Sequence, residues 1–123
     1  MIKTAWLTIG TEHFTEVVEF YHLVLQQDPK PFSPDRYAEF HLPGLRLGIF
    51  SPQADHQQEF AHSDQSGFSL CLEVENLEMA IARFQRGNLK LHSGEIQTAS
   101  HGREIYVYDP AGNRLILHES FGS

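Results

Sequence analysis

The sequence predicts an α+β fold in which two tandem βαβββ modules form a curved mixed sheet around a central cleft. Three observations predict it. The chain begins with a strand pattern followed by a helix pattern, this order returns in the second half, and each half ends with two strand patterns joined by a proline- and glycine-containing turn. A length of 123 residues suits one domain made of two short modules.

The first module opens with alternating apolar and polar residues over positions 3–9, which is the pattern of a strand with one buried face. Phe14–Leu25 then carries apolar residues at the three- and four-residue spacing of one helix face. In the second module, residues 68–74 alternate in the same way, and residues 77–84 repeat the helix face. A strand followed by a helix is therefore predicted twice.

The ends of the second helix and the segments after both helices can also be predicted. Asn76 is expected to be the N-cap, and Gly87 is expected to close the helix. Residues 28–34 and 89–97 follow the two helices, and each segment is expected to hold one short edge strand.

Each module is predicted to end in a β-hairpin. Residues 36–47 and 103–115 both place a proline and a glycine between two strand patterns. Residues 51–67 are polar and rich in turn formers, so they are expected to link the copies. The whole chain, 1–123, is therefore interpreted as a single domain, with modules at about 1–52 and 67–120.

Composition excludes several classes of function. Nine Lys and Arg residues face sixteen Asp and Glu residues, and the resulting charge of −7 would repel nucleic acid. No apolar run approaches the roughly 20 residues of a membrane helix, so neither a membrane partner nor a signal peptide is expected. Cys71 is the only cysteine, which suits a reducing cytoplasm and is expected to serve packing.

The second hairpin carries a family resemblance. Asp109-Pro110-Ala111-Gly112-Asn113, within residues 106–117, resembles the hairpin that closes proteins of the vicinal oxygen chelate superfamily. This superfamily includes glyoxalase I, bleomycin-resistance proteins, fosfomycin-resistance proteins and extradiol dioxygenases. Phe20-Tyr21 and residues 74–77 are similar to the same family, and the resemblance covers nearly the whole chain. In this turn Asp109 and Gly112 are expected to serve the backbone.

The resemblance also implies where a metal ion would bind. Metal-dependent members carry ligands on the first and last strand of each module, and the corresponding positions here are Trp6, Gly48, Ser69 and Ile116. Only the serine offers a donor, and it is a poor one. The chain is therefore predicted to belong to the metal-free branch of the family and to use no cofactor.

Strand alternation predicts which side chains face the cleft. Those with the parity of the ligand positions are Thr4, Trp6, Thr8, Glu39, His41, Arg46, Gly48, Phe50, Ser69, Cys71, Glu73, Tyr106, Tyr108, Arg114, Ile116 and His118. From this set the residues predicted to bind a ligand are Trp6, Arg46, Phe50, Ser69, Tyr106, Tyr108, Arg114 and His118. Tyr106 is the foremost of them, because fosfomycin-resistance proteins with a similar hairpin use a tyrosine there on substrate.

Catalysis without metal has only a few candidates. Six histidines follow no ligand template and are expected to be solvated: His13, His22, His56, His62, His92 and His101. His41 and His118 lie in hairpin strands, where either one beside Glu39 is a candidate general base.

The leading hypothesis is a cytoplasmic, metal-independent protein that sequesters a small aromatic or amphipathic compound. The alternative is an enzyme, a lyase or an isomerase- or dioxygenase-like protein that uses His41 or His118. It would act either without metal or with a displaced metal site made of Glu39, His41 and His118. A third possibility is an interaction module with a collapsed cleft. A homodimer is expected, because members of this family commonly pair and open sheet edges need covering.

Overall fold

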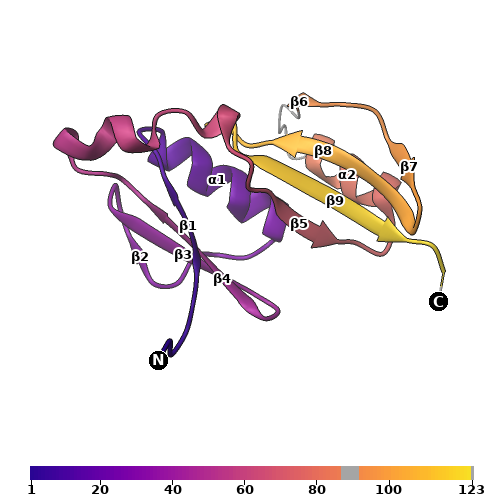
Figure 1. The fold of residues 1–123 in the computed structure, drawn as a ribbon, viewed down its shortest axis with the longest axis horizontal. Helices are drawn as coiled ribbons and strands as arrows, with labels where there is room; N and C mark the ends of the chain where they lie inside the picture. Colours follow the sequence, from indigo (N-terminus) through magenta and orange to yellow (C-terminus); the bar gives the residue numbers. More distant parts are fainter. Residues whose placement is uncertain (87–91, 123) are drawn as a thin grey trace. The chain divides into compact units, whose positions relative to one another are not determined.

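The computed structural model describes residues 1–86 and 92–122, and the chain divides into two compact units, Met1–His62 and Ser63–Ser123. Figure 1 shows the first unit in indigo to magenta and the second in magenta to yellow. Each unit holds one mixed sheet and one α-helix. The predicted α+β class and the repeated βαβββ plan are confirmed. Among the described residues, no helix has the length and apolar character needed to span a membrane.

The first unit has one α-helix and four strands. They are β1 (Leu7–Gly10), α1 (Phe14–Leu25), β2 (Phe32–Ser33), β3 (Tyr37–Leu42) and β4 (Leu45–Phe50). The strand order is β1-β4-β3-β2, with β1 parallel to β4 and the other pairs antiparallel. The helix has the predicted bounds, and it ends where Gln26 adopts the left-handed conformation.

One face of this sheet forms the core under α1. Ala38 and Phe40 of β3 are fully buried, and so are Leu47 and Ile49 of β4. The ring of Tyr21, also fully buried, lies 6.4 Å from that of Phe40. Because strand side chains alternate, residues between these positions lie on the opposite face of the sheet.

The second unit repeats this plan with one additional strand. Its strands and helix are β5 (Leu70–Glu73), α2 (Leu77–Arg86), β6 (His92–Ser93), β7 (Gln97–Ala99), β8 (Gly102–Tyr108) and β9 (Arg114–Ser120). The order is β5-β9-β8-β6, and β7 also pairs with β8. The sequence predicted one short strand in this region, but the structure has two. The strand β7 pairs with the first residues of β8, and β6 pairs with its last residues.

One further expectation needs correction. The first strand of each unit is shorter than predicted, so Trp6 and Ser69 each lie one residue before it. Both are edge strands with a single partner, β4 for β1 and β9 for β5. Within the described part of the chain, the residues before Leu7 and Leu70 have no partner in the sheet, so the strands begin there. The segment 51–67 lies between the last strand of the first copy and the first strand of the second. It contains the 3-10 helices η1 (Ala54–Phe60) and η2 (Ser63–Gln65), and Phe60 packs edge-on against Phe50.

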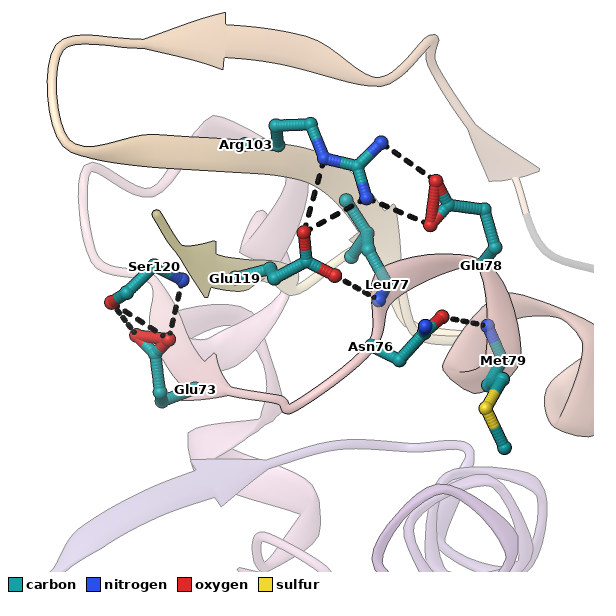
Figure 2. Close-up of polar contacts among 8 residues, drawn as sticks. All are labelled: Glu73, Asn76, Leu77, Glu78, Met79, Arg103, Glu119 and Ser120. Carbon is teal, nitrogen blue, oxygen red and sulfur yellow. Dashed lines mark hydrogen bonds and ion pairs between the residues drawn. The ribbon is translucent and has the colours of Figure 1, made fainter. Parts of the chain in front are cut away.

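The beginning of α2 is fixed by side chains from two directions (Figure 2). Asn76 Oδ1 accepts a hydrogen bond from the Met79 N–H at 2.9 Å, which confirms Asn76 as the N-cap. Glu119 Oε2, on β9, accepts from the Leu77 N–H at 2.8 Å. Arg103 on β8 donates to both Glu119 and Glu78, the latter at 2.6 and 2.8 Å. Helix and sheet are thereby joined at this end, whereas Gly87 lies outside the described residues.

The turn between β8 and β9 is built as expected. Asp109 Oδ1 accepts hydrogen bonds from the N–H groups of Ala111 and Asn113, at 2.9 and 3.0 Å. Gly112 has a φ of 91°, in the left-handed region that favours glycine. Both residues therefore serve the backbone of the turn.

Candidate functional site

The candidate site residues lie on the sheet faces turned away from the helices, here called the helix-free faces. In the first unit this face carries Thr8, Tyr37, Glu39, His41, Arg46, Gly48 and Phe50. In the second unit it carries Cys71, Glu73, Glu104, Tyr106, Tyr108, Arg114, Ile116 and His118. The faces agree with the predicted parity, while the predicted cleft between the two modules stays a prediction.

Glu39 is the centre of a hydrogen-bonded cluster in the first unit. Its Oε1 accepts from the Tyr37 hydroxyl at 2.8 Å and from the Trp6 indole N–H at 3.2 Å. Its Oε2 lies 2.8 Å from His41 Nε2, which donates because a carboxylate only accepts. Arg46 Nη1 lies 4.0 Å from the same oxygen. The residue is only 7% exposed, so these partners replace the water that its charge would otherwise need.

The cluster keeps Glu39 ionised. The hydrogen bond from Tyr37 is the largest cause that lowers the pKa of Glu39, with Trp6, His41 and Arg46 adding to it against the opposing effect of burial. Burial and the neighbouring carboxylate raise the pKa of Tyr37, so its hydroxyl keeps its proton and remains a donor. A carboxylate held in this way is a fixed anion rather than a proton donor at neutral pH.

Gly48 makes room for this arrangement. A Cβ atom at position 48 would lie 2.7 Å from the Tyr37 hydroxyl oxygen and 3.1 Å from its Cε1. The phenol therefore lies over the glycine, at a position where the resemblance implies a metal ligand. Sequence reasoning missed Tyr37, although it has the parity of Glu39 and His41 and was recognisable by that signal.

The backbone beneath the cluster is anchored by neighbouring segments. Gln27 donates from Nε2 to the His41 carbonyl at 3.0 Å and accepts the His41 N–H at 2.6 Å. The Lys30 N–H donates to the Glu39 carbonyl at 2.9 Å, and the Glu39 N–H donates to the Pro31 carbonyl at 3.1 Å. Glu39 and His41 are therefore held on a strand that is bonded beyond its sheet partners.

In the second unit the corresponding feature is a carboxylate–histidine pair. His118 is 7% exposed, and its Nδ1 lies 2.7 Å from Glu73 Oε1. Glu73 also accepts from the N–H and hydroxyl of Ser120 (Figure 2). Because Glu73 only accepts, Nδ1 carries the proton of this hydrogen bond. The Nε2 atom of His118 is the one buried side-chain polar atom of the described residues without a hydrogen-bond partner.

His118 is enclosed by the turn before β8. The His101 ring lies 4.9 Å from the His118 ring, and a Cβ atom on Gly102 would come within 2.8 Å of Nε2. Glu104 is the cross-strand partner of His118. The partner carboxylate of His118 is therefore Glu73, whereas Glu39 bonds His41.

The remaining predicted site residues divide between polar and apolar contacts. Arg114 Nε donates to the Ser69 hydroxyl at 2.6 Å, so the only oxygen donor among the four implied ligand positions already has a partner. Phe50 packs on Phe60, and Tyr106 is exposed beside its cross-strand partner Ile116.

Burial and nearby carboxylates raise the pKa of Cys71, which makes its thiol a poor nucleophile.

The four implied ligand positions do not fit a metal ion. The Trp6 indole nitrogen is only a donor and is bonded to Glu39, Gly48 lies under Tyr37, Ile116 has no polar atom, and Ser69 holds Arg114. Across residues 1–86 and 92–122, no group of three or more His, Cys, Asp or Glu side chains is arranged to hold one.

The sequence and the fold were compared with known protein families and solved structures. Residues 3–117 match the family model described as the glyoxalase/bleomycin resistance protein/dioxygenase superfamily. A glyoxalase-related enzyme from Fulvimarina pelagi superposes with a TM-score of 0.75 at 17% identity, covering 98% of this chain and 89% of that one.

Two further solved structures share the fold. A glyoxalase/bleomycin resistance protein from Catenulispora acidiphila gives a TM-score of 0.71 at 17% identity, covering 95% of this chain and 97% of that one. The fosfomycin resistance protein FosX from Listeria monocytogenes gives 0.73 at 13% identity, covering 98% and 95%. No protein of curated function matches the chain.

Proposed function

Because the chain belongs to the glyoxalase/bleomycin resistance protein/dioxygenase superfamily, we propose that it binds a small aromatic or amphipathic molecule at its helix-free faces, without a metal ion and without transforming it. The observation that carries this proposal is the Glu39 cluster. Trp6 and Tyr37 stand where the family resemblance implies metal chemistry, and hydrogen bonds to one buried carboxylate hold both in place.

The composition of both faces supports a binding role. Exposed or half-exposed aromatic rings supply contact area, namely Trp6 in the first unit with Tyr106 and Tyr108 in the second. Arg46 and Arg114, which begin the same repeated Arg-Leu pair in the two units, supply polar contacts. A few polar groups among aromatic rings is the usual composition of a small-molecule site. We further propose a cytoplasmic location, since the single cysteine suits a reducing compartment.

The absence of metal dependence is testable on the purified, untagged chain. We expect Zn²⁺, Ni²⁺ and Mn²⁺ to bind no more tightly than they bind scattered surface histidines, because affinity requires several donors held in geometry. Chelator treatment should leave the melting temperature unchanged. Elemental analysis and calorimetric titration measure both points, and one stoichiometric ion that raises the melting temperature would contradict the proposal.

Binding itself can be followed through Trp6, the only tryptophan of the chain. We expect small phenyl compounds to change Trp6 emission saturably and to raise the melting temperature as their concentration rises. Phenylacetate, 2-phenylethanol and phenethylammonium form a suitable first series, since they share a ring and differ in charge. If none of the three binds by fluorescence or calorimetry, the proposed function is contradicted.

One observation favours a second candidate function, metal-free acid–base catalysis in the second unit. Glu73 holds His118 through Nδ1, and Nε2 has no hydrogen-bond partner among the described residues, which is the geometry that a histidine general base requires. This candidate predicts that a bound compound is converted to product and that His118→Gln stops conversion without abolishing binding. Recovery of every bound compound unchanged after long incubation would remove it.

A further inference from the structure

The charge of the ligand can be inferred from the way the Glu39 cluster uses its own groups. We propose that the ligand of the first unit is an aromatic anion, with its ring against Trp6 and its negative group on the Arg46 guanidinium. This inference rests on the proposed function, because it specifies the ligand of the same face.

Arg46 is the cation that this face leaves accessible. Its side chain is 54% exposed, and its ion pair with Glu39 is a long contact of 4.0 Å. A guanidinium has five N–H donors in a planar fork that matches a carboxylate, and one contact of this length leaves that fork available. Arg46 is therefore placed to receive an anionic group from solution.

Trp6 supplies a fixed aromatic surface beside this cation. The indole N–H is directed to Glu39 Oε1, so the orientation of the ring is set, yet the residue remains 45% exposed. Its ring can therefore contact a planar ligand without losing the hydrogen bond to Glu39. Aromatic pairs of this kind add to the burial of apolar area.

The same cluster disfavours a cationic ligand. Glu39 is the carboxylate at the centre of this face, but it is buried, and its oxygens already receive hydrogen bonds from Tyr37, Trp6 and His41. A cation arriving from solution would meet Arg46 rather than Glu39. His41 uses Nε2 on Glu39 and is itself half-exposed, so its other ring nitrogen remains available as an additional polar contact.

The experiment compares the binding of three ligands to the natural chain and to its arginine variants. Calorimetry and Trp6 emission give the dissociation constants of phenylacetate, 2-phenylethanol and phenethylammonium for the natural chain, Arg46→Gln and Arg36→Gln. Arg36 is exposed and directly precedes β3, and among the described residues no hydrogen bond or ion pair joins its side chain to Glu39. Its variant therefore loses the same charge without removing a contact of the cluster. We expect phenylacetate to bind about fivefold more tightly than the alcohol, which corresponds to an exposed ion pair of about 1 kcal/mol.

Arg46→Gln should remove this preference, and Arg36→Gln should retain it. Arg46→Lys serves as a second variant, because it keeps the charge and should keep part of the preference. Equal binding of acid and alcohol, tighter binding of the amine, or an equal loss in both glutamine variants would each overturn the inference while leaving the proposed function intact. Failure of all three ligands to bind would contradict the proposed function itself.

Discussion

At the scale of single residues, Glu39 determines the geometry of its neighbours. A buried carboxylate is costly unless hydrogen bonds replace its water, and here an indole, a phenol and an imidazole do so. Each donor is thereby held in one orientation. A buried charge can in this way fix the arrangement of the side chains on a sheet face.

The acid titration of Glu39 should be visible in Trp6 emission. Its folded pKa is below the usual value of 4.5, so the stability that its charge contributes is present above that pH and is lost as pH falls through the lowered pKa. We expect an emission change with a midpoint below pH 4.5, while circular dichroism shows the helices intact. Glu39→Gln should abolish the change, and Glu59→Gln, on the exposed 3-10 helix, should leave it; a transition retained in Glu39→Gln would refute the assignment.

Gly48 and Tyr37 should be energetically coupled. Gly48→Ala places a methyl group against the phenol and should lower the free energy of unfolding by about 1–2 kcal/mol, because Tyr37 must give up its bond to Glu39. Tyr37→Phe should cost about 1 kcal/mol by removing the same bond. In the double variant the losses should not add, as measured by urea denaturation. Additivity within about 0.5 kcal/mol would show that the two positions act independently.

At the scale of elements, the second unit depends on how its helix and turns begin and end. Asn76 and Glu119 satisfy N–H groups at the start of α2 that have no partner within the helix, while Arg103 ties Glu119 to the helix surface. In the turn between β8 and β9, the Asp109 carboxylate likewise accepts hydrogen bonds from backbone N–H groups. Short elements such as these gain stability from side-chain caps that longer ones need less.

The turn makes a direct prediction for Gly112. Its positive φ disfavours any side chain, and an added Cβ would also approach Asp64 Cβ at 3.1 Å. Gly112→Ala should therefore lower the free energy of unfolding by about 1 kcal/mol. Gly67→Ala is the matched control, because a Cβ there meets open space, and it should change stability by less than about 0.5 kcal/mol. Equal stability of the two variants in thermal unfolding would contradict this account.

At the scale of the whole molecule, periodicity predicted what depends on local pattern. The bounds of α1, the N-cap Asn76, both hairpins and the repeated plan followed from apolar spacing and turn chemistry. Contacts between distant positions could not be predicted in this way. The pairing of Glu73 with His118 and the position of Tyr37 over Gly48 depend on side-chain orientation and on exact strand pairing. Apolar alternation predicts the face on which a residue lies, but a shift of two residues would keep the same face. Strand lengths at sheet edges were wrong because they too depend on strand pairing.

The expected homodimer is also testable at this scale. Each sheet ends in an edge strand, β1 in the first unit and β5 in the second, and exposed edges favour association. Sedimentation equilibrium should give the mass of two 14.0 kDa chains at micromolar concentration. A single species of one-chain mass over that range would refute it.

The strand order has a consequence for the growing polypeptide. In both units the first strand pairs with the last, β1 with β4 and β5 with β9. On a ribosome, the first sheet can therefore close once Phe50 has emerged, while β5 and α2 must wait for residues 114–119 to provide a strand partner and the Glu119 carboxylate. The first unit should thus form earlier in translation, and the second only after residues 114–119 have been made.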